Sequence, residues 1–92
     1  MLFDWDEAKA ASNIVKHGIA FEAVHDFEFD GALIVDDDRR DYGELRKRAY
    51  GRIGDRLHVL VFTQRATRVR VISLRRASRR EFAIFKARKR EG

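Results

Sequence analysis

Three short groups of residues in this chain carry side chains suited to proton transfer or phosphate binding. The first is Lys16-His17-Gly18. A histidine can move a proton near neutral pH, and a neighbouring lysine can stabilise the oxyanion that forms when a phosphodiester is attacked. The same residues are also typical of a helix end, where Lys and His balance the helix dipole and Gly adopts the left-handed conformation. The residues alone leave both interpretations open.

The second group, Glu44-x-Arg46-x-Arg48, stands where a strand is predicted to begin. Side chains two positions apart in a strand project to the same face, so Arg46 and Arg48 can act together. Two guanidinium groups on one face can hold a phosphodiester through paired hydrogen bonds. Glu44 is either a general base or a salt-bridge partner for an arginine, and the residues do not decide between these roles.

The third group is a series of arginines late in the chain: Arg68, Arg70, Arg75, Arg76, Arg79 and Arg80. Strand alternation predicts two faces here, with Arg68, Arg70, Ile72 and Leu74 on one and Val69, Val71 and Ser73 on the other. If Arg70 and Arg46 share a sheet face, their side chains converge on an anion site. The residues expected to contact an RNA backbone around that site are Arg48, Arg75, Arg76 and Arg79.

A single-stranded RNA partner would also need an aromatic ring on which a base can stack. Tyr50 and Trp5 are the candidates, although Trp5 is more typical of a core position. Charge supports a polyanion, because residues 65–92 hold eleven basic residues and two acids, and residues 1–38 hold ten acids and two lysines. A solvated basic face is the alternative interpretation.

The residue inventory favours chemistry without a metal or any other cofactor. The chain has no cysteine, and its three histidines are scattered. The acidic run Asp36-Asp37-Asp38 suggests Mg²⁺, but consecutive strand residues point to opposite faces and cannot all converge. Metal-free RNA cleavage needs only a base for the 2′-hydroxyl proton, cations for the pentacoordinate phosphate and an acid for the 5′-oxygen.

These groups must be positioned by a single small domain, residues 1–92. Strands are predicted at 2–5, 32–35, 46–53, 57–63 and 69–74. Helices are predicted from the N-cap Asp6 to about His17, from Phe21 to about Phe27, and from Ser78, which opens the capping box Ser78-x-x-Glu81. The first helix is expected to bury Ala8, Ala11, Ile14 and Val15, and the last helix Phe82 and Phe85. The short connections favour an α+β fold with an antiparallel sheet of about four strands.

The start of the chain has neither a basic segment nor an apolar segment of the signal-peptide kind. No apolar run approaches the roughly 20 residues that span a bilayer. We therefore expect a cytoplasmic protein that does not associate with a membrane.

Taken together, three blocks of sequence resemble the BrnT toxin family. The first block is Phe3-Asp4-Trp5-Asp6 followed by Lys9, Asn13, Lys16-His17-Gly18 and Phe21-Glu22. The second is Gly43-Glu44-x-Arg46, and the third runs from Arg70 through Ile72-Ser73 and Arg75-Arg76 to Glu81. The blocks cover nearly the whole chain. The chain departs from the family pattern at Phe85, where a tyrosine is common, so no phenol can donate a proton there and we expect Phe85 to pack inward.

The resemblance implies a bacterial type II toxin with a RelE-like fold that cuts RNA without a metal and inhibits translation. It also implies a BrnA-type antitoxin, a DNA-binding protein of ribbon-helix-helix type, and a toxin homodimer within a complex that reaches operator DNA through the antitoxin. The leading hypothesis assigns catalysis to Lys16, His17, Glu44, Arg46 and Arg70. The alternative is a non-catalytic module that binds nucleic acid or the antitoxin.

Overall fold

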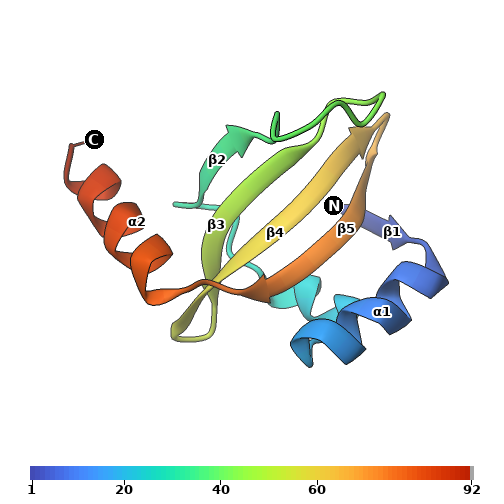
Figure 1. The fold of residues 1–92 in the computed structure, drawn as a ribbon, viewed down its shortest axis with the longest axis horizontal. Coiled ribbons are helices and arrows are strands. Elements are labelled where there is room, and N and C mark those ends of the chain that lie inside the picture. The colour runs from blue at the N-terminus through green and yellow to red at the C-terminus, as the bar shows by residue number, and fades with distance from the viewer. Residues whose placement is uncertain (92) are drawn as a thin grey trace.

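The computed structural model describes residues 1–91 and shows one five-stranded sheet with a helix at each side (Figure 1). The strand order is β1-β5-β4-β3-β2. The elements along the chain are β1 (Leu2–Trp5), α1 (Glu7–His17), the 3₁₀ helix η1 (Phe21–Asp26), β2 (Leu33–Asp36), β3 (Lys47–Ile53), β4 (Arg56–Arg65), β5 (Arg68–Arg76) and α2 (Arg79–Glu91).

The α+β class and the helices at both ends of the chain agree with the sequence prediction, but the sheet differs from it. The sheet has five strands instead of about four and is mixed, because β1 runs parallel to β5 while the other pairs are antiparallel. Hairpin turns predict only the pairing of strands that are neighbours in sequence. In contrast, β1 pairs with the last strand, with Phe3 opposite Val69, 66 positions further along the chain.

Helix α1 has the predicted ends but faces the sheet with a different side. Asp6 accepts hydrogen bonds from the amides of Ala8 and Lys9, and Gly18 ends the helix at a φ of 71°. The expected apolar stripe is wrong: Ile14 is 51% exposed and Val15 87% exposed, while Ala10 and Asn13 are buried.

Asn13 explains the orientation of α1. Its Nδ2 donates to the carbonyl oxygens of Leu74 (2.7 Å) and Ile19 (2.9 Å), and its Oδ1 accepts from the Leu74 amide at 3.2 Å. Strand β1 pairs with β5 only as far as Val71, so the backbone of Leu74 lies beyond the reach of β1. The Asn13 amide supplies the donor and acceptor that a neighbouring strand would supply there.

One face of the sheet, the core face, packs against η1 and α1. Its fully buried side chains include Phe21 and Val24 from η1, Leu60 from β4 and Leu74 from β5. Trp5 packs against this cluster and meets Phe21 edge to face, which confirms the core interpretation.

Gly51 lets the segment after η1 approach β3 closely. A Cβ at this position would lie 2.5 Å from the Phe27 ring.

The opposite face, the open face, is covered by arginine side chains. Val59 and Val61 are buried there, opposite Arg75 and Arg48 respectively in the strand register. Arginine stems bury apolar surface while their guanidinium groups stay near water. The segment 37–46 between β2 and β3 also folds against this face, because Thr63 donates a hydrogen bond to the Leu45 carbonyl at 2.8 Å.

A bulge in β5 overturns the predicted side-chain alternation of that strand. Val61 pairs with Ser73 and Phe62 pairs with Val71, so one residue of β5 is extra. Leu74 therefore joins Val69 and Val71 on the core face instead of sharing a face with Arg70. Arg70 and Arg75 consequently both project from the open face.

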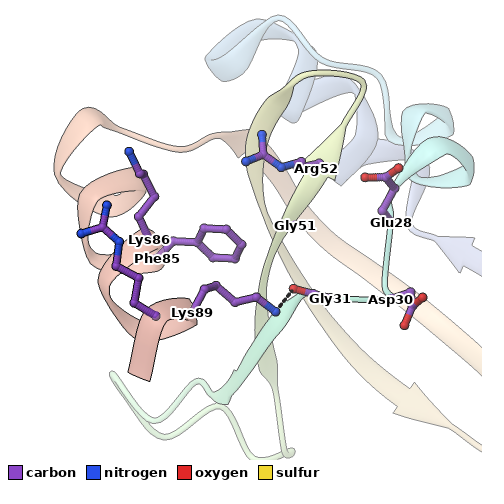
Figure 2. Close-up of a pocket in the computed structure, with 9 residues that line it drawn as sticks. Glu28, Asp30, Gly31, Gly51, Arg52, Phe85, Lys86 and Lys89 are labelled. Carbon is purple, nitrogen blue, oxygen red and sulfur yellow. Dashed lines mark hydrogen bonds between the residues drawn. The ribbon is translucent and has the colours of Figure 1, made fainter. Parts of the chain in front are cut away.

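Helix α2 has the predicted capping box, and among the residues of this helix only Phe85 is buried. The Ser78 amide donates to Glu81 at 2.8 Å, and the Glu81 amide donates to the Ser78 hydroxyl at 3.1 Å. Phe85 is buried as expected, whereas Phe82 is 37% exposed, so the inward assignment of Phe82 is wrong. Figure 2 shows the Phe85 ring directed towards β3 at Gly51, and Lys89 bound to the Gly31 carbonyl.

None of the helices in residues 1–91 combines the length and apolar character needed to cross a membrane.

Candidate nucleic-acid site on the open face

Four arginines surround a hollow of about 190 Å³ on the open face, which we call the central hollow. Its floor is formed by Val59 and Val61 of β4 and by Ile72 and Ser73 at the bulge of β5. The arginines come from three parts of the chain and are Arg39, Arg46, Arg48 and Arg75. They face one acid in the lining, Asp37, so the hollow has the charge that a phosphate group requires.

Arg46 is held by its neighbours in the segment before β3. Its Nε lies 3.2 Å from Glu44 Oε2, and its guanidinium carbon lies 4.0 Å from the centroid of the Tyr42 ring. Such a cation–π contact fixes the plane of the guanidinium group. In residues 1–91 no hydrogen bond engages its two terminal nitrogens, which therefore remain available for a ligand.

Glu44 is a salt-bridge partner in this structure. A hydrogen bond from Arg65 (3.1 Å) and a second one from Arg46 hold the pKa of Glu44 below its ordinary value. A carboxylate with a lowered pKa is a weaker proton acceptor. The sequence left open whether Glu44 is a general base or a salt-bridge partner. The geometry favours the salt-bridge role.

Asp37 is the buried anchor of the central hollow. Its side chain is fully buried and accepts two hydrogen bonds from Arg39, at 2.6 and 2.9 Å. The Arg39 hydrogen bonds, together with the charge of Arg48, lower the pKa of Asp37. Arg48 Nε lies 3.6 Å from Asp37 Oδ1, and Arg48 also donates to the Tyr50 hydroxyl at 3.1 Å. The Asp37 carboxylate and the Tyr50 hydroxyl together fix the orientation of the Arg48 guanidinium group.

Arg75 links the central hollow to helix α2. It donates to both carboxylate oxygens of Glu81, at 2.8 and 2.9 Å. This pairing, with the Ser78 amide as a second donor, lowers the pKa of Glu81 to about 2. Any phosphate that binds Arg75 must share it with this carboxylate.

The remaining candidate residues lie around the central hollow rather than in it. Arg70 projects from the open face and pairs with Asp4 of β1 at 3.5 Å. Lys16 and His17 are exposed and line a second hollow, the α1 hollow. Ile72 and Ser73 line both hollows, so the bulge of β5 is the boundary between them.

Arg76 and Arg79 lie on the far side of Arg75. They line a third hollow with Arg56, Leu57 and Phe82, at the junction of β5 and α2. We call it the β5–α2 hollow. The pair Arg75-Arg76 is therefore divided between two hollows, because successive strand residues point to opposite sides.

Sequence reasoning missed Asp37 and Arg39 as a pair, and it missed Tyr42. All three lie in the segment between β2 and β3, which has no strand or helix period from which a face can be predicted. The acidic run Asp36-Asp37-Asp38 offered one signal, because strand alternation sends successive side chains to opposite faces. Asp36 accordingly pairs with Lys47 on one face, while Asp37 is buried among arginines on the other. Across residues 1–91 no three metal-ligand side chains cluster together.

A comparison with protein families identifies the family of this chain. A family model described as "Ribonuclease toxin, BrnT, of type II toxin-antitoxin system" matches residues 5–81. The matched range contains the central hollow and the α1 hollow, and it ends at the first turn of α2. No curated protein sequence matches the chain significantly.

Proposed function

The chain belongs to the BrnT family of ribonuclease toxins of type II toxin–antitoxin systems, and from this premise we propose that it is an endoribonuclease that cuts RNA at the central hollow without a metal ion. The observation that carries this proposal is Arg46. Its guanidinium plane is fixed by Tyr42 and Glu44, and its terminal nitrogens point to no protein partner among the described residues. A guanidinium group held in this way is prepared for a phosphodiester.

The proposed reaction is transfer within the RNA backbone. A base removes the 2′-hydroxyl proton, the 2′-oxygen attacks phosphorus, and the bond to the 5′-oxygen breaks as an acid protonates that oxygen. We assign phosphate stabilisation to Arg46 and Arg70, with Lys16 and His17 as the groups that transfer protons and neutralise the oxyanion. Glu44 is the weaker candidate for the base because its pKa is lowered. Backbone contacts fall to Arg48, Arg75, Arg76 and Arg79.

This assignment requires the RNA to cross the bulge of β5. Lys16 and His17 line the α1 hollow, so a substrate that contacts them and the central hollow together must lie over Ile72 and Ser73, which the two hollows share.

One observation favours the alternative, a module that binds RNA or the antitoxin without turnover. The described lining of the central hollow contains no histidine, and its one carboxylate, Asp37, is buried in ion pairs.

The purified chain incubated with RNA and EDTA tests the proposal. We expect cleavage by the wild type and a loss of 10²-fold or more in Arg46→Ala and His17→Ala. Lys47→Ala is the matched control, because Lys47 follows Arg46 in the chain but projects from the other face of β3 and pairs with Asp36. Binding without cleavage by the wild type would establish the alternative, and growth arrest that survives both active-site substitutions would do the same.

The family also supports proposals about partners. We propose a BrnA-type antitoxin of ribbon-helix-helix type, a toxin homodimer within the complex, and contact with operator DNA through the antitoxin. Inhibition of translation, a cytoplasmic location and a RelE-like classification of the fold are predictions of the same kind. Copurification of the antitoxin with the chain, followed by measurement of the mass of the complex, tests the first two.

A further inference from the structure

A fourth hollow lies on the open face, and it shares Arg48 with the central hollow. Its walls are mostly apolar. It has a volume of about 210 Å³ and lies between α2 and the strands β2 and β3. Its apolar lining consists of Leu33, Val35, Tyr50, Ile84 and Phe85. Arg48, Arg88 and Glu81, whose carboxylate is paired with Arg75, also border it. We call it the apolar hollow.

We propose that the apolar hollow binds a nucleobase of the substrate RNA, next to the phosphate held in the central hollow. The inference rests on the proposed ribonuclease function and adds a base-recognition site to it. Arg48 is the first reason, because it lines both hollows. A nucleotide whose phosphate contacts Arg48 from one side has its base within reach of the apolar hollow on the other.

The composition of the walls is the second reason. Single-stranded RNA is recognised where aromatic rings stack on bases and cationic groups contact the adjoining backbone. Tyr50 supplies a partly exposed ring, Phe85 supplies a buried ring at the base of the hollow, and Arg48 and Arg88 supply positive charges. A purely aliphatic partner would gain nothing from two guanidinium groups beside the apolar walls.

The third reason is that the walls are fixed before any ligand binds. The Tyr50 hydroxyl accepts a hydrogen bond from Arg48, and Phe85 is only 7% exposed. Helix α2 is tied to the sheet at one end by the paired bonds between Glu81 and Arg75, and at the other by Lys89 and the Gly31 carbonyl (Figure 2). A preformed site loses less conformational entropy on binding.

Ile84 makes the site accessible to experiment. It is 48% exposed, so the helix can accept a larger or smaller side chain there without disturbing the core. Ile84, Phe85 and Arg88 all follow residue 81, where the family match ends. The helical wall of the hollow therefore comes largely from the part of this chain that lies outside the matched range, and the strand wall comes from within it.

The test uses Ile84→Trp to fill the hollow and Ile84→Ala to widen it. Ala83→Trp is the matched control, because Ala83 is exposed on the same helix and is not among the residues that line the hollow. The substrates are short RNAs of known cleavage position, each with one abasic residue on either side of the cut. Sequencing of the cut ends of a random RNA pool gives the base preference, and circular dichroism confirms that each variant is folded.

For the wild type we expect an abasic residue at one flanking position to lower kcat/KM about tenfold, as the loss of one stacked base would. Ile84→Trp should lower kcat/KM for intact RNA by a similar factor and remove the abasic effect. Ile84→Ala should weaken the base preference while cleavage continues, and Ala83→Trp should match the wild type.

The proposal is overturned if the wild type cleaves RNA but both Ile84 variants keep the wild-type base preference and abasic effect. That outcome leaves the ribonuclease function standing. If Ile84→Trp instead weakens antitoxin binding alone, the hollow is a protein site and the proposal is again wrong. Absence of both cleavage and RNA binding by the wild type would remove the proposed function together with this inference.

Discussion

Each arginine of the central hollow is oriented by an acidic or aromatic side chain that lies two to six positions away in the chain. The orienting carboxylates are Asp37, Glu44 and Glu81, and the orienting rings are Tyr42 and Tyr50. The acids reduce the net charge of the site, but they also fix the guanidinium groups, so less side-chain entropy is lost when a phosphate binds. For a site that must stabilise charge in a transition state, fixed donors matter more than total charge.

At the residue scale, the first prediction concerns Tyr42, which we expect to act through its ring. Tyr42→Leu removes the face that lies 4.0 Å from Arg46 and should lower kcat/KM for RNA about five- to tenfold, which corresponds to roughly 1 kcal/mol. Tyr42→Phe keeps the ring and should retain near wild-type activity. Initial rates of cleavage of a short RNA measure both.

Tyr50→Phe provides the comparison, because it deletes the same hydroxyl group at a tyrosine that orients an arginine through that hydroxyl. Arg48 loses a hydrogen bond in this variant, so activity should fall although the ring remains. An inactive Tyr42→Phe protein would mean instead that Tyr42 acts through its hydroxyl group, either in proton transfer or through its interaction with Arg39.

The second residue-scale prediction concerns the pH dependence of the Arg75–Glu81 pair. The pKa of Glu81 is lowered to about 2 in the folded protein from an ordinary value of 4.5. The unfolded chain therefore binds a proton at higher pH than the folded protein, and the pair stabilises the fold fully above pH 4.5. This stabilisation is lost as the pH falls through about 2.

Glu81→Gln should accordingly be less stable than the wild type at pH 7 by about 1–2 kcal/mol, because both side chains of the pair remain partly exposed. Urea unfolding at pH 7 and at pH 2.5 measures the difference between the two proteins. The difference should shrink at pH 2.5, and a constant difference at both pH values would contradict the linkage.

At the scale of elements, the caps were predictable from sequence and the orientation of α1 was not. Asp6, Gly18 and the Ser78-x-x-Glu81 box each act within one helix turn, and each was confirmed. The apolar period of α1 instead favoured burial of Ile14, because periodicity weighs only side-chain hydrophobicity. Periodicity takes no account of hydrogen bonding. The unpaired edge of β5 at Leu74 needs a donor and an acceptor, and the Asn13 side chain provides both.

Asn13→Ala tests this account of α1. The substitution leaves the buried amide and carbonyl of Leu74 without their side-chain partner and should destabilise the protein by about 2–4 kcal/mol. Val15→Ala, at a position that is 87% exposed, should change stability by less than about 0.5 kcal/mol. Chemical denaturation of the two variants measures both free energies of unfolding, and the reverse order of effects would restore the apolar-stripe interpretation.

The candidate site was predictable only where it follows a regular strand. Arg46 and Arg48 share a face because β3 alternates without interruption, as the sequence indicated. Arg75 lies at the same site because of the bulge in β5. A single extra residue in a strand reverses the face on which every later side chain lies. No sequence rule places such a bulge, so the neighbour relation between Arg75 and Arg70 required coordinates.

At the scale of the whole molecule, two groups of arginines follow one another along β4. The first lies on the open face, and the second lies where β5 meets α2, with Arg76 projecting from the opposite side of β5 to Arg75. Val59 lines the central hollow and Leu57 lines the β5–α2 hollow. Two residues of a strand span about 7 Å, so the hollows are neighbours along one direction of the sheet. A strand of RNA that runs along β4 and turns around the end of the sheet at the β5–α2 junction would meet Arg46 and Arg48 first, and then Arg76 and Arg79.

This path predicts how RNA binding depends on salt. Each phosphate contact with a single strand contributes about 0.7 to the slope of log K against log salt concentration. For an RNA of roughly 15 nucleotides, Arg46→Ala and Arg76→Ala should each reduce the slope by about that amount. Lys47→Ala is the control and should leave the slope unchanged, because Lys47 projects from the core-face side of β3. Shortening the RNA until it covers only the central hollow should abolish the effect of Arg76→Ala and preserve that of Arg46→Ala, because the shorter backbone no longer reaches the β5–α2 hollow. Equal slopes for all three variants would show that the RNA does not follow β4, and that the basic surface acts through its overall charge.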